Sequence, residues 1–433
     1  MSPPQLHPRP PLEGIRVLDL GTRIGAPFCA GLLGEWGADV IKVEQPGSGD
    51  FMRSIGPFAP EPARQGPGYS LFWSVEGRGR RSVTCDLRTV EGQDLFRRLA
   101  AGSDVICENF RPGTLEGWGI GPAQLDERLV WVRISAFGQD GPYAKRPGLD
   151  RLGIAYGGLL HLTGEPGRPP VRPGVTVSDY LTGVFAAEAA LAALYRRDAT
   201  RGDGTGGTGT GGTGGTDATD ATSATAGKGA VVDASLYGSV LRILEWTIAG
   251  YDNLGTVRAR EGNRLANSAP LDNYPTADGR FVCIVAGSDA NFARLCKAME
   301  RPDLLDDPRF ATLADRASNG DEINGIVADW TAALCATDIE RICVACDVPV
   351  ATAYSAVEIV SDPHICERSD VVSVEDPVIG PVRQQAPFPR LVGEPRPVPS
   401  GAPRLGEHNT EVWCGIAGLT DDELSTLSEK GVV

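Results

Sequence analysis

Short apolar runs alternate with helical patterns near the start of the chain. Residues 15–20 (IRVLDL) form an apolar run of strand length, and residues 26–37 (APFCAGLLGEWG) repeat apolar positions at helical spacing. Residues 38–44 (ADVIKVE) form a second apolar run. This order and these lengths predict a βαβ unit with parallel strands.

The same alternation continues up to residue 137. Apolar runs occupy residues 82–87, 104–110 and 129–137, and a helical pattern occupies residues 91–101. Strands that are apolar along their whole length are typical of a parallel sheet covered on both faces. We therefore predict an α/β fold, with an open parallel sheet of Rossmann-like βαβ units.

The middle of the chain contains the clearest helix and then a tract of low complexity. Residues 180–197 (YLTGVFAAEAALAALYRR) place large apolar side chains at three- and four-residue intervals. Residues 201–229 are rich in Gly and Thr and contain no apolar residue larger than Ala. Such a tract buries too little surface to offset its ordering entropy, so we predict a disordered insertion.

A different rhythm begins near residue 273 and indicates a smaller α+β domain. Residues 274–286 (YPTADGRFVCIVA) predict a hairpin with its turn at Asp278-Gly279. Helical patterns follow, and short strands and a last helix near residues 421–430 end the chain. The predicted divisions are a large α/β domain (1–200), the insertion (201–229), a linker helix with the small domain (230–345) and a return to the large domain (346–433).

Charge and composition narrow the classes of partner. Acidic residues outnumber basic ones by 56 to 41, which gives a net charge of −15 and argues against nucleic acid or an anionic membrane surface. The Pro-rich start resembles no signal peptide, and no uninterrupted apolar run has the length of a membrane span. We therefore expect a cytoplasmic protein without a membrane partner.

Motif searches exclude several chemistries. The loop at residues 21–27 (GTRIGAP) follows the first predicted strand, but it has neither dinucleotide-binding nor P-loop spacing. The four histidines stand in no nucleophile or metal-binding pattern, so no metal site is predicted. What remains is a carboxylate, Asp179, immediately before the clearest helix.

Asp179 has two interpretations that local spacing does not separate. Asp is among the best helix N-cap residues, and a cap alone would account for its position. A carboxylate at a helix N-terminus also stays ionised, and an ionised carboxylate attacks activated carbonyl groups.

An ordered series of segments resembles the class III coenzyme A (CoA) transferases, the family of formyl-CoA transferase and carnitine CoA-transferase. The resemblance implies that the large domain, residues 1–200, binds CoA. The similar segments extend over nearly the whole chain outside the Gly/Thr tract. They are residues 12–50, 80–87, 104–116 (DVICENFRPGTLE), 134–142 (ISAFGQDGP), 161–183 (HLTGEPGRPPVRPGVTVSDYLTG) and 403–412 (PRLGEHNTEV).

The resemblance implies roles for individual residues. Asp179 falls on the family's nucleophile, and Asp150 falls on an acidic position that supports catalysis. Ile24 and Gln45 stand where the formyl-CoA enzymes have Gln and Arg, which argues against formyl-CoA as the substrate. The positions implied to bind CoA are Ile24, Gln45, Arg80, Arg81, Asn109, Phe110, Arg111, Ser135, Phe137 and Gly138.

The activity that the resemblance implies is acyl-CoA:carboxylate CoA transfer through covalent intermediates on Asp179. The CoA thioester is a substrate, no bound cofactor is expected, and the family implies an interlocked homodimer. Residues 161–183 most resemble transferases that use succinyl-CoA with dicarboxylic acids. An α-methylacyl-CoA racemase is an alternative, although Gly148-Leu149-Asp150 lacks the His that those enzymes place before the acid. A non-catalytic CoA-binding protein is another.

Overall fold

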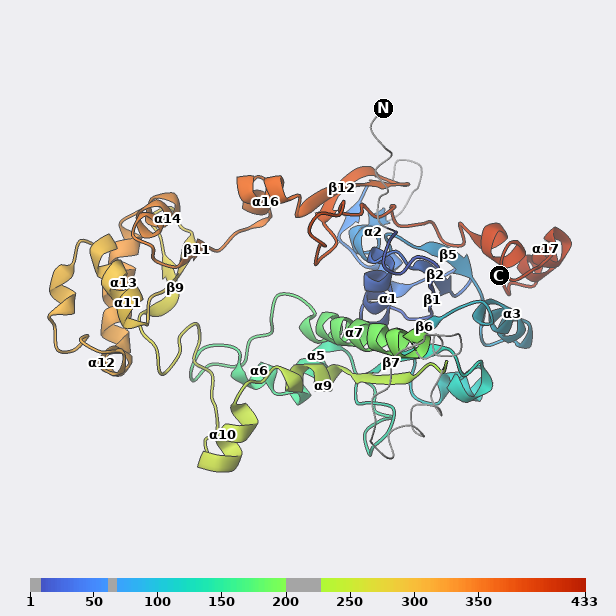
Figure 1. Cartoon of the computed structure of the whole chain (residues 1–433), viewed down its shortest axis with the longest axis horizontal. Helices are drawn as coiled ribbons and strands as arrows, with labels where there is room; N and C mark the ends of the chain where they lie inside the picture. The colour runs from blue at the N-terminus through green and yellow to red at the C-terminus, as the bar shows by residue number, and fades with distance from the viewer. Residues whose placement is uncertain (1–8, 61–67, 200–226) are drawn as a thin grey trace, which may run out of the picture. The chain divides into compact units, whose positions relative to one another are not determined.

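A six-stranded parallel sheet lies at the centre of the larger part of the chain in a computed structural model, which describes residues 9–60, 68–199 and 227–433 (Figure 1). Counted along the chain, its strands lie in the order 3-2-1-4-5-6, the Rossmann order. The predicted open parallel sheet is confirmed. Its strands are β1 (Arg16–Asp19), β2 (Asp39–Glu44), β5 (Arg81–Thr84), β6 (Val105–Glu108), β7 (Val130–Ser135) and β8 (Val231–Ser235).

Two helices, α1 (Gly25–Glu35) and α7 (Val177–Ala199), pack on each other and on one face of this sheet (Figure 1). Alanines form much of the buried side of α7. A Cβ atom on Gly183 would lie 2.9 Å from Phe28 Cδ1 and 3.1 Å from the carbonyl oxygen of Gly25, so any larger residue would force these neighbours to move apart. The two small residues therefore bring the first turn of α1 against α7.

The opposite face is covered by α3 (Val90–Ala100) together with the end of the chain, η5 (Thr410–Cys414) and α17 (Asp421–Glu429). Trp413 is fully buried there, and its indole N–H donates to the carbonyl of Thr84 over 3.2 Å. The C-terminal segment is thus part of the main core, and the predicted last helix is confirmed.

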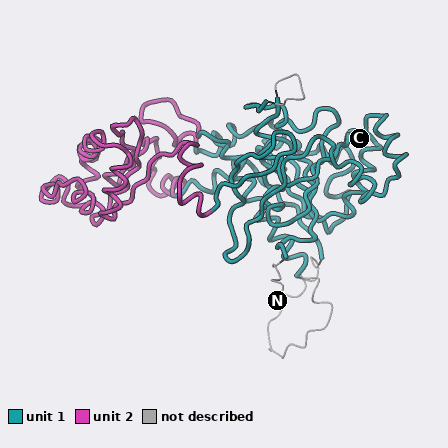
Figure 2. The backbone as a smooth tube through the Cα atoms, turned by 90° about the horizontal axis from the view of Figure 1, so that it is seen from above, with its two compact units in different colours: residues 1–159, 174–245, 369–433 teal, residues 160–173, 246–368 magenta. Residues whose placement is uncertain are grey.

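The chain divides into two compact units, drawn in different colours in Figure 2. Unit 1 comprises residues 1–159, 174–245 and 369–433 and contains the parallel sheet. Its shorter elements are η1 (Phe51–Ser54), β3 (Phe58–Ala59), β4 (Tyr69–Ser70), α2 (Leu71–Glu76), α4 (Thr114–Gly117), η2 (Pro122–Gln124), α5 (Asp150–Tyr156), α9 (Leu236–Arg242), β12 (Val371–Asp376) and β13 (Gly380–Gln385).

Unit 2 comprises residues 160–173 and 246–368 and has its own core around an antiparallel sheet of order β11-β10-β9. The predicted hairpin is confirmed, with Gly279 left-handed in its turn. The helix α6 (Leu159–Leu162) begins at the boundary with unit 1. The other elements are α10 (Thr247–Leu254), β9 (Leu271–Pro275), β10 (Phe281–Val285), α11 (Asp289–Ala298), η4 (Pro302–Leu305), α12 (Leu313–Ser318), α13 (Gly320–Ala332), α14 (Ala336–Ala345), β11 (Val350–Thr352), α15 (Ala356–Ile359) and α16 (Pro363–Arg368).

The unit boundaries differ from the predicted domain limits in three places. Residues 160–173, predicted in the large domain, belong to unit 2. The strand β8 pairs with β7 and so belongs to the main sheet rather than to a linker. The strand β11 pairs with β10, which keeps the chain in unit 2 until residue 368 rather than 345. The predicted disordered insertion, 201–229, falls outside the described residues except for its last three positions.

The helix α7 is long and apolar enough to satisfy a length and composition test for a membrane-spanning helix. A core helix satisfies the same test. Residues such as Ala186, Ala190 and Leu194 of α7 are buried in the core of unit 1, so its apolar character is accounted for by this packing.

Candidate functional site

The strand order reverses between β1 and β6, and the loops that follow these two strands diverge at the carboxyl edge of the sheet. Such a switch point is where open α/β sheets bind ligands. The side chain of Asn109 joins the two loops here. It accepts from the Thr22 N–H over 2.9 Å and donates to the Thr22 carbonyl over 2.7 Å.

A buried ionic cluster contacts the loop between β1 and α1 and holds it in place. The Lys42 ammonium lies 3.3 Å from Asp19 and 2.9 Å from Asp50, and it also donates to the Gly21 carbonyl. Arg80 pairs with Asp19 over 2.7 Å. Burial would lower the Lys42 pKa, but the neighbouring carboxylates outweigh it and the pKa is raised. Two cations and two anions therefore neutralise each other inside unit 1.

Asp50 transmits this support to the loop itself. Its Oδ1 accepts from the Arg23 backbone N–H over 3.1 Å and from the Thr22 hydroxyl over 3.3 Å. Arg23 adopts a left-handed backbone conformation with φ of 68°. Such a conformation is uncommon outside glycine and persists only where the surroundings hold it. The position of Arg23 is therefore set by the fold.

Asp179 lies in the first turn of α7, against the start of α1. The helix begins at Val177, two residues before Asp179. A Cβ atom on Gly25 would lie 3.7 Å from Asp179 Oδ1 and 3.2 Å from Ile134 Cγ2. The absence of a side chain at Gly25 leaves the carboxylate open toward the first turn of α1.

The capping interpretation of Asp179 is wrong, because another aspartate holds the helix start. Asp150 Oδ1 accepts from the Ser178 backbone N–H over 2.8 Å and from the Ser178 hydroxyl over 2.9 Å. Asp150 is itself buried at the first position of α5. Within the described part of the chain, nothing donates a hydrogen bond to the Asp179 carboxylate. Asp150 thus positions the first turn of α7, and the Asp179 carboxylate is left without a hydrogen-bond donor among the described residues.

From the sequence we expect the helix N-terminus to keep Asp179 ionised, but its surroundings instead raise its pKa to about 7. Burial is the largest cause, and the nearby Asp150 carboxylate adds to it, while the positive charge of Arg23 acts in the opposite direction. A carboxylate with this pKa is poorly solvated, and its charge sits between a repelling neighbour and an attracting one. These are the conditions in which catalytic carboxylates are found.

A cavity of about 230 Å³ opens at the carboxyl ends of β1, β2, β5 and β6. Gln45 and Phe110, two of the residues implied to bind CoA, line it together with Thr22, Asp50 and Arg88. Phe110 is held edge-on to Trp118, with 5.4 Å between the ring centroids. Asn109, beside Phe110, holds the loop at its edge.

The two adjacent arginines implied to bind CoA, Arg80 and Arg81, are paired with carboxylates of the chain itself. Arg80 is buried in the pair with Asp19, and Arg81 bonds to Asp39 and lies 2.7 Å from Glu411. Arg111 is exposed on the loop after β6. Of this predicted set, Arg111 is the cation that faces solvent.

The remaining predicted residues lie at the end of β7 and inside the α1 turn. The Ser135 hydroxyl accepts from the Gly138 N–H over 2.9 Å, and Gly138 is left-handed with φ of 91°. Phe137 packs edge-on to Tyr156 of α5, the helix that starts with Asp150. Ile24 is buried in a separate apolar cluster directly before Gly25.

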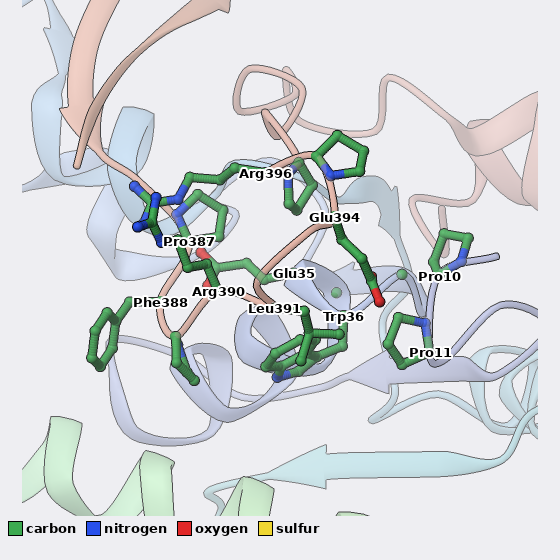
Figure 3. Close-up of a pocket in the computed structure, with 15 residues that line it drawn as sticks. Pro10, Pro11, Glu35, Trp36, Pro387, Phe388, Arg390, Leu391, Glu394 and Arg396 are labelled. Carbon is green, nitrogen blue, oxygen red and sulfur yellow. The ribbon is translucent and has the colours of Figure 1, made fainter. Parts of the chain in front are cut away.

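Like the cavity of about 230 Å³, a pair of other hollows in unit 1 have neither Asp150 nor Asp179 among their lining residues. One, of about 250 Å³, is formed by prolines and by Phe388, Arg390 and Glu394 around Trp36, at the other end of α1 from Asp179 (Figure 3). The second, of about 640 Å³, is lined by apolar side chains of α1 and α7, including Phe28 and Val184, and by residues 385–399.

Sequence reasoning missed Arg23 and Arg88. Arg23 stands in the quoted GTRIGAP loop, and its place directly after the first strand is a signal of ligand contact. Arg88 follows the third strand in the same way. No cluster of three potential metal ligands occurs in the part of the chain that the structure describes.

The family model and the similar curated proteins point to the same kind of enzyme. The model of CoA-transferase family III matches residues 12–208 and 206–409. A succinyl-CoA--D-citramalate CoA-transferase from Chloroflexus aurantiacus is 40% identical over 99% of both chains. A succinyl-CoA--L-malate CoA-transferase beta subunit from the same organism is 37% identical over 98% of both. A CAIB/BAIF family protein from Brucella suis has a similar solved structure, with a TM-score of 0.78, 29% identity and coverage of 94% of this chain and 99% of that one.

The raised pKa of Asp179 predicts how the free energy of unfolding depends on pH. Above pH 7 the folded protein holds a charge that its surroundings disfavour, so Asp179→Asn should raise the free energy of unfolding at pH 8 by roughly 2–4 kcal/mol. As the pH falls through 7 toward 4, the wild-type carboxyl takes up its proton in the folded state and the difference should disappear. Urea unfolding of both proteins from pH 4 to 8 measures it.

Asp329→Asn, on the exposed side of α13, is the matched control. As an exposed surface substitution, it should change the free energy of unfolding at pH 8 by less than about 0.5 kcal/mol. An Asp179→Asn protein that is no more stable than wild type at pH 8 would contradict the account of the Asp179 environment.

Proposed function

Because the chain belongs to CoA-transferase family III, we propose that it moves CoA from succinyl-CoA to a short dicarboxylic acid, with Asp179 as the nucleophile. The predicted family and the predicted enzyme class, a CoA-transferase, are confirmed by relatives of full length. The mechanism rests on one observation. The Asp179 carboxylate, at the edge of the sheet where the strand order reverses, accepts no hydrogen bond from the described residues.

The proposed reaction begins when an Asp179 oxygen attacks the thioester carbonyl. An aspartyl–acyl anhydride forms and the CoA thiolate leaves with the electron pair of the broken C–S bond. The thiolate then attacks the aspartyl carbonyl of the anhydride, which gives an aspartyl–CoA thioester and releases the donor acid as its carboxylate. The acceptor carboxylate repeats the two steps in reverse. Each covalent step divides one difficult exchange into easier ones.

The helix starts that meet at Asp179 supply the positioning that this reaction needs. Asp150 holds the α7 turn through Ser178 and raises the pKa of Asp179. A carboxylate of higher pKa is a stronger nucleophile once it is ionised, so its attack is favoured near neutral pH. The first turn of α1 has no side-chain cap, so its N–H groups are available to hydrogen-bond to a tetrahedral oxyanion.

CoA itself is proposed to lie along the carboxyl edge of the sheet. The cavity beside Gln45 and Phe110 accommodates part of the nucleotide, which is too large to fit there as a whole. The exposed guanidinium group of Arg111 is suited to its phosphates. Arg88 lines the cavity and is paired with Asp86 over 2.7 Å. The Ser135–Gly138 loop is the proposed second wall, closer to Asp150.

The direct test is a transfer assay with the purified chain. Succinyl-, acetyl- and formyl-CoA are each offered with citramalate, malate, glutarate and oxalate, and the CoA products are identified by mass spectrometry. Transfer from succinyl-CoA to at least one dicarboxylic acid is expected, and it should be lost in Asp179→Asn because an amide forms no anhydride. Transfer by Asp179→Asn at the wild-type rate would rule out the proposed nucleophile.

A homodimer is part of the proposal. Apolar side chains stand exposed around the 640 Å³ hollow, with Val175 61%, Phe388 75% and Val398 58% accessible. Exposed apolar patches of this kind mark association surfaces. Light scattering should give twice the chain mass of 45.7 kDa, and a mass of one chain at micromolar concentration would contradict the dimer.

A further inference from the structure

The guanidinium of Arg23 lies near Asp179, and no carboxylate of the described residues is paired with it. It lies over the ring of Phe51, with 3.9 Å between its central carbon and the ring centroid. Within the described residues the guanidinium makes no hydrogen bond and no ion pair. A cation stacked on an aromatic face keeps the N–H groups at its edge available for a ligand.

The neighbouring cations are already neutralised. Lys42 and Arg80 are buried in pairs with Asp19 and Asp50, and Arg53 lies 2.7 Å from Glu44. Arg23 alone of these four carries its charge into the loop without a carboxylate partner. An incoming anion would therefore meet Arg23.

The fold keeps Arg23 and Asp179 near each other without joining them. Gly25, two residues after Arg23, is the residue against which Asp179 Oδ1 lies. The charge of Arg23 is felt at Asp179, where it opposes the rise in pKa, yet no ion pair forms between the two side chains. The left-handed backbone of Arg23 and the bond from its N–H to Asp50 hold this separation.

We propose that Arg23 binds the second carboxylate of a dicarboxylic acyl group or acid, while Asp179 reacts at the first. This rests on the proposed function and adds the residue that selects the substrate. A chain of four or five carbons with a carboxylate at one end and a thioester at the other spans two groups that are close but not paired. The planar guanidinium donates two parallel hydrogen bonds to a carboxylate.

This arrangement predicts discrimination by charge. Succinyl-CoA and butyryl-CoA have four-carbon acyl groups, and only the first ends in a carboxylate. A hydrogen-bonded pair of charged groups corresponds to about 10- to 100-fold in affinity. Succinyl-CoA should therefore be preferred by that factor, and the preference should depend on Arg23.

The test compares Arg23→Met with wild type at pH 9, above the ionisation of Asp179, so that any change in the Asp179 pKa does not enter. For Arg23→Met, kcat/KM with succinyl-CoA should fall about 10- to 100-fold, and kcat/KM with butyryl-CoA should stay within a few-fold. Arg146→Met is the matched control, because Arg146 also stacks on a ring, that of Tyr143 at 3.5 Å, in unit 1. It should leave the ratio of the two substrates unchanged.

A binding measurement separates this inference from the transferase mechanism. Calorimetry with Asp179→Asn should show tighter binding of succinyl-CoA than of butyryl-CoA, and the double variant Arg23→Met/Asp179→Asn should lose that difference while it still binds free CoA. A wild-type chain without transfer activity would refute the proposed function but leave this readout valid. An equal loss for both thioesters, or no loss for either, would overturn the role of Arg23.

Discussion

The ion pairs of Lys42 hold the candidate site in place. Lys42 points from β2 into a fully buried position, where it contacts two carboxylates and one backbone carbonyl. Asp50, one of those carboxylates, fixes the backbone of the loop that carries Arg23 and leads into Gly25. Removing one member of a buried ionic group leaves an uncompensated charge, at a cost of about 3–5 kcal/mol. Loop position and core stability are therefore coupled.

The site combines this rigid support with an unfavourable charge. Asp150 satisfies the start of α7 in place of Asp179, and in doing so brings a second carboxylate close to the first. A protein selected for stability alone would avoid two neighbouring carboxylates in a poorly solvated place. This unfavourable charge is useful if Asp179 is the nucleophile, because burial and the repulsion from Asp150, which together raise its pKa, no longer oppose a charge once the carboxylate is acylated.

The elements predicted from apolar periodicity agree with the structure, because buried parallel strands and amphipathic helices leave strong local patterns. β1, the hairpin of β9 and β10, and α17 were all predictable in this way. The pairing of β8 with β7 and of β11 with β10 was not predictable, because the sequence of a short strand does not indicate which sheet it joins.

The same limit applies to the site. Spacing suggested a cap at Asp179, and only the tertiary contact from Asp150 shows that the cap comes from elsewhere. Arg80 and Arg81 look like a surface charge run in the sequence, but their ion pairs with Asp19 and Asp39 depend on sheet order. The proposed role of Arg23 depends on the absence of a carboxylate partner among the described residues, and sequence spacing does not reveal such an absence.

The most direct measurement of the central claim is to trap the covalent enzyme. The chain is incubated with succinyl-CoA and no acceptor, treated with hydroxylamine or borohydride, digested and analysed by mass spectrometry. Our account predicts a modified Asp179 in the peptide that contains Ser178 and Tyr180, in wild type only. Turnover of succinyl-CoA with an unmodified Asp179, or modification of a different residue, would contradict it.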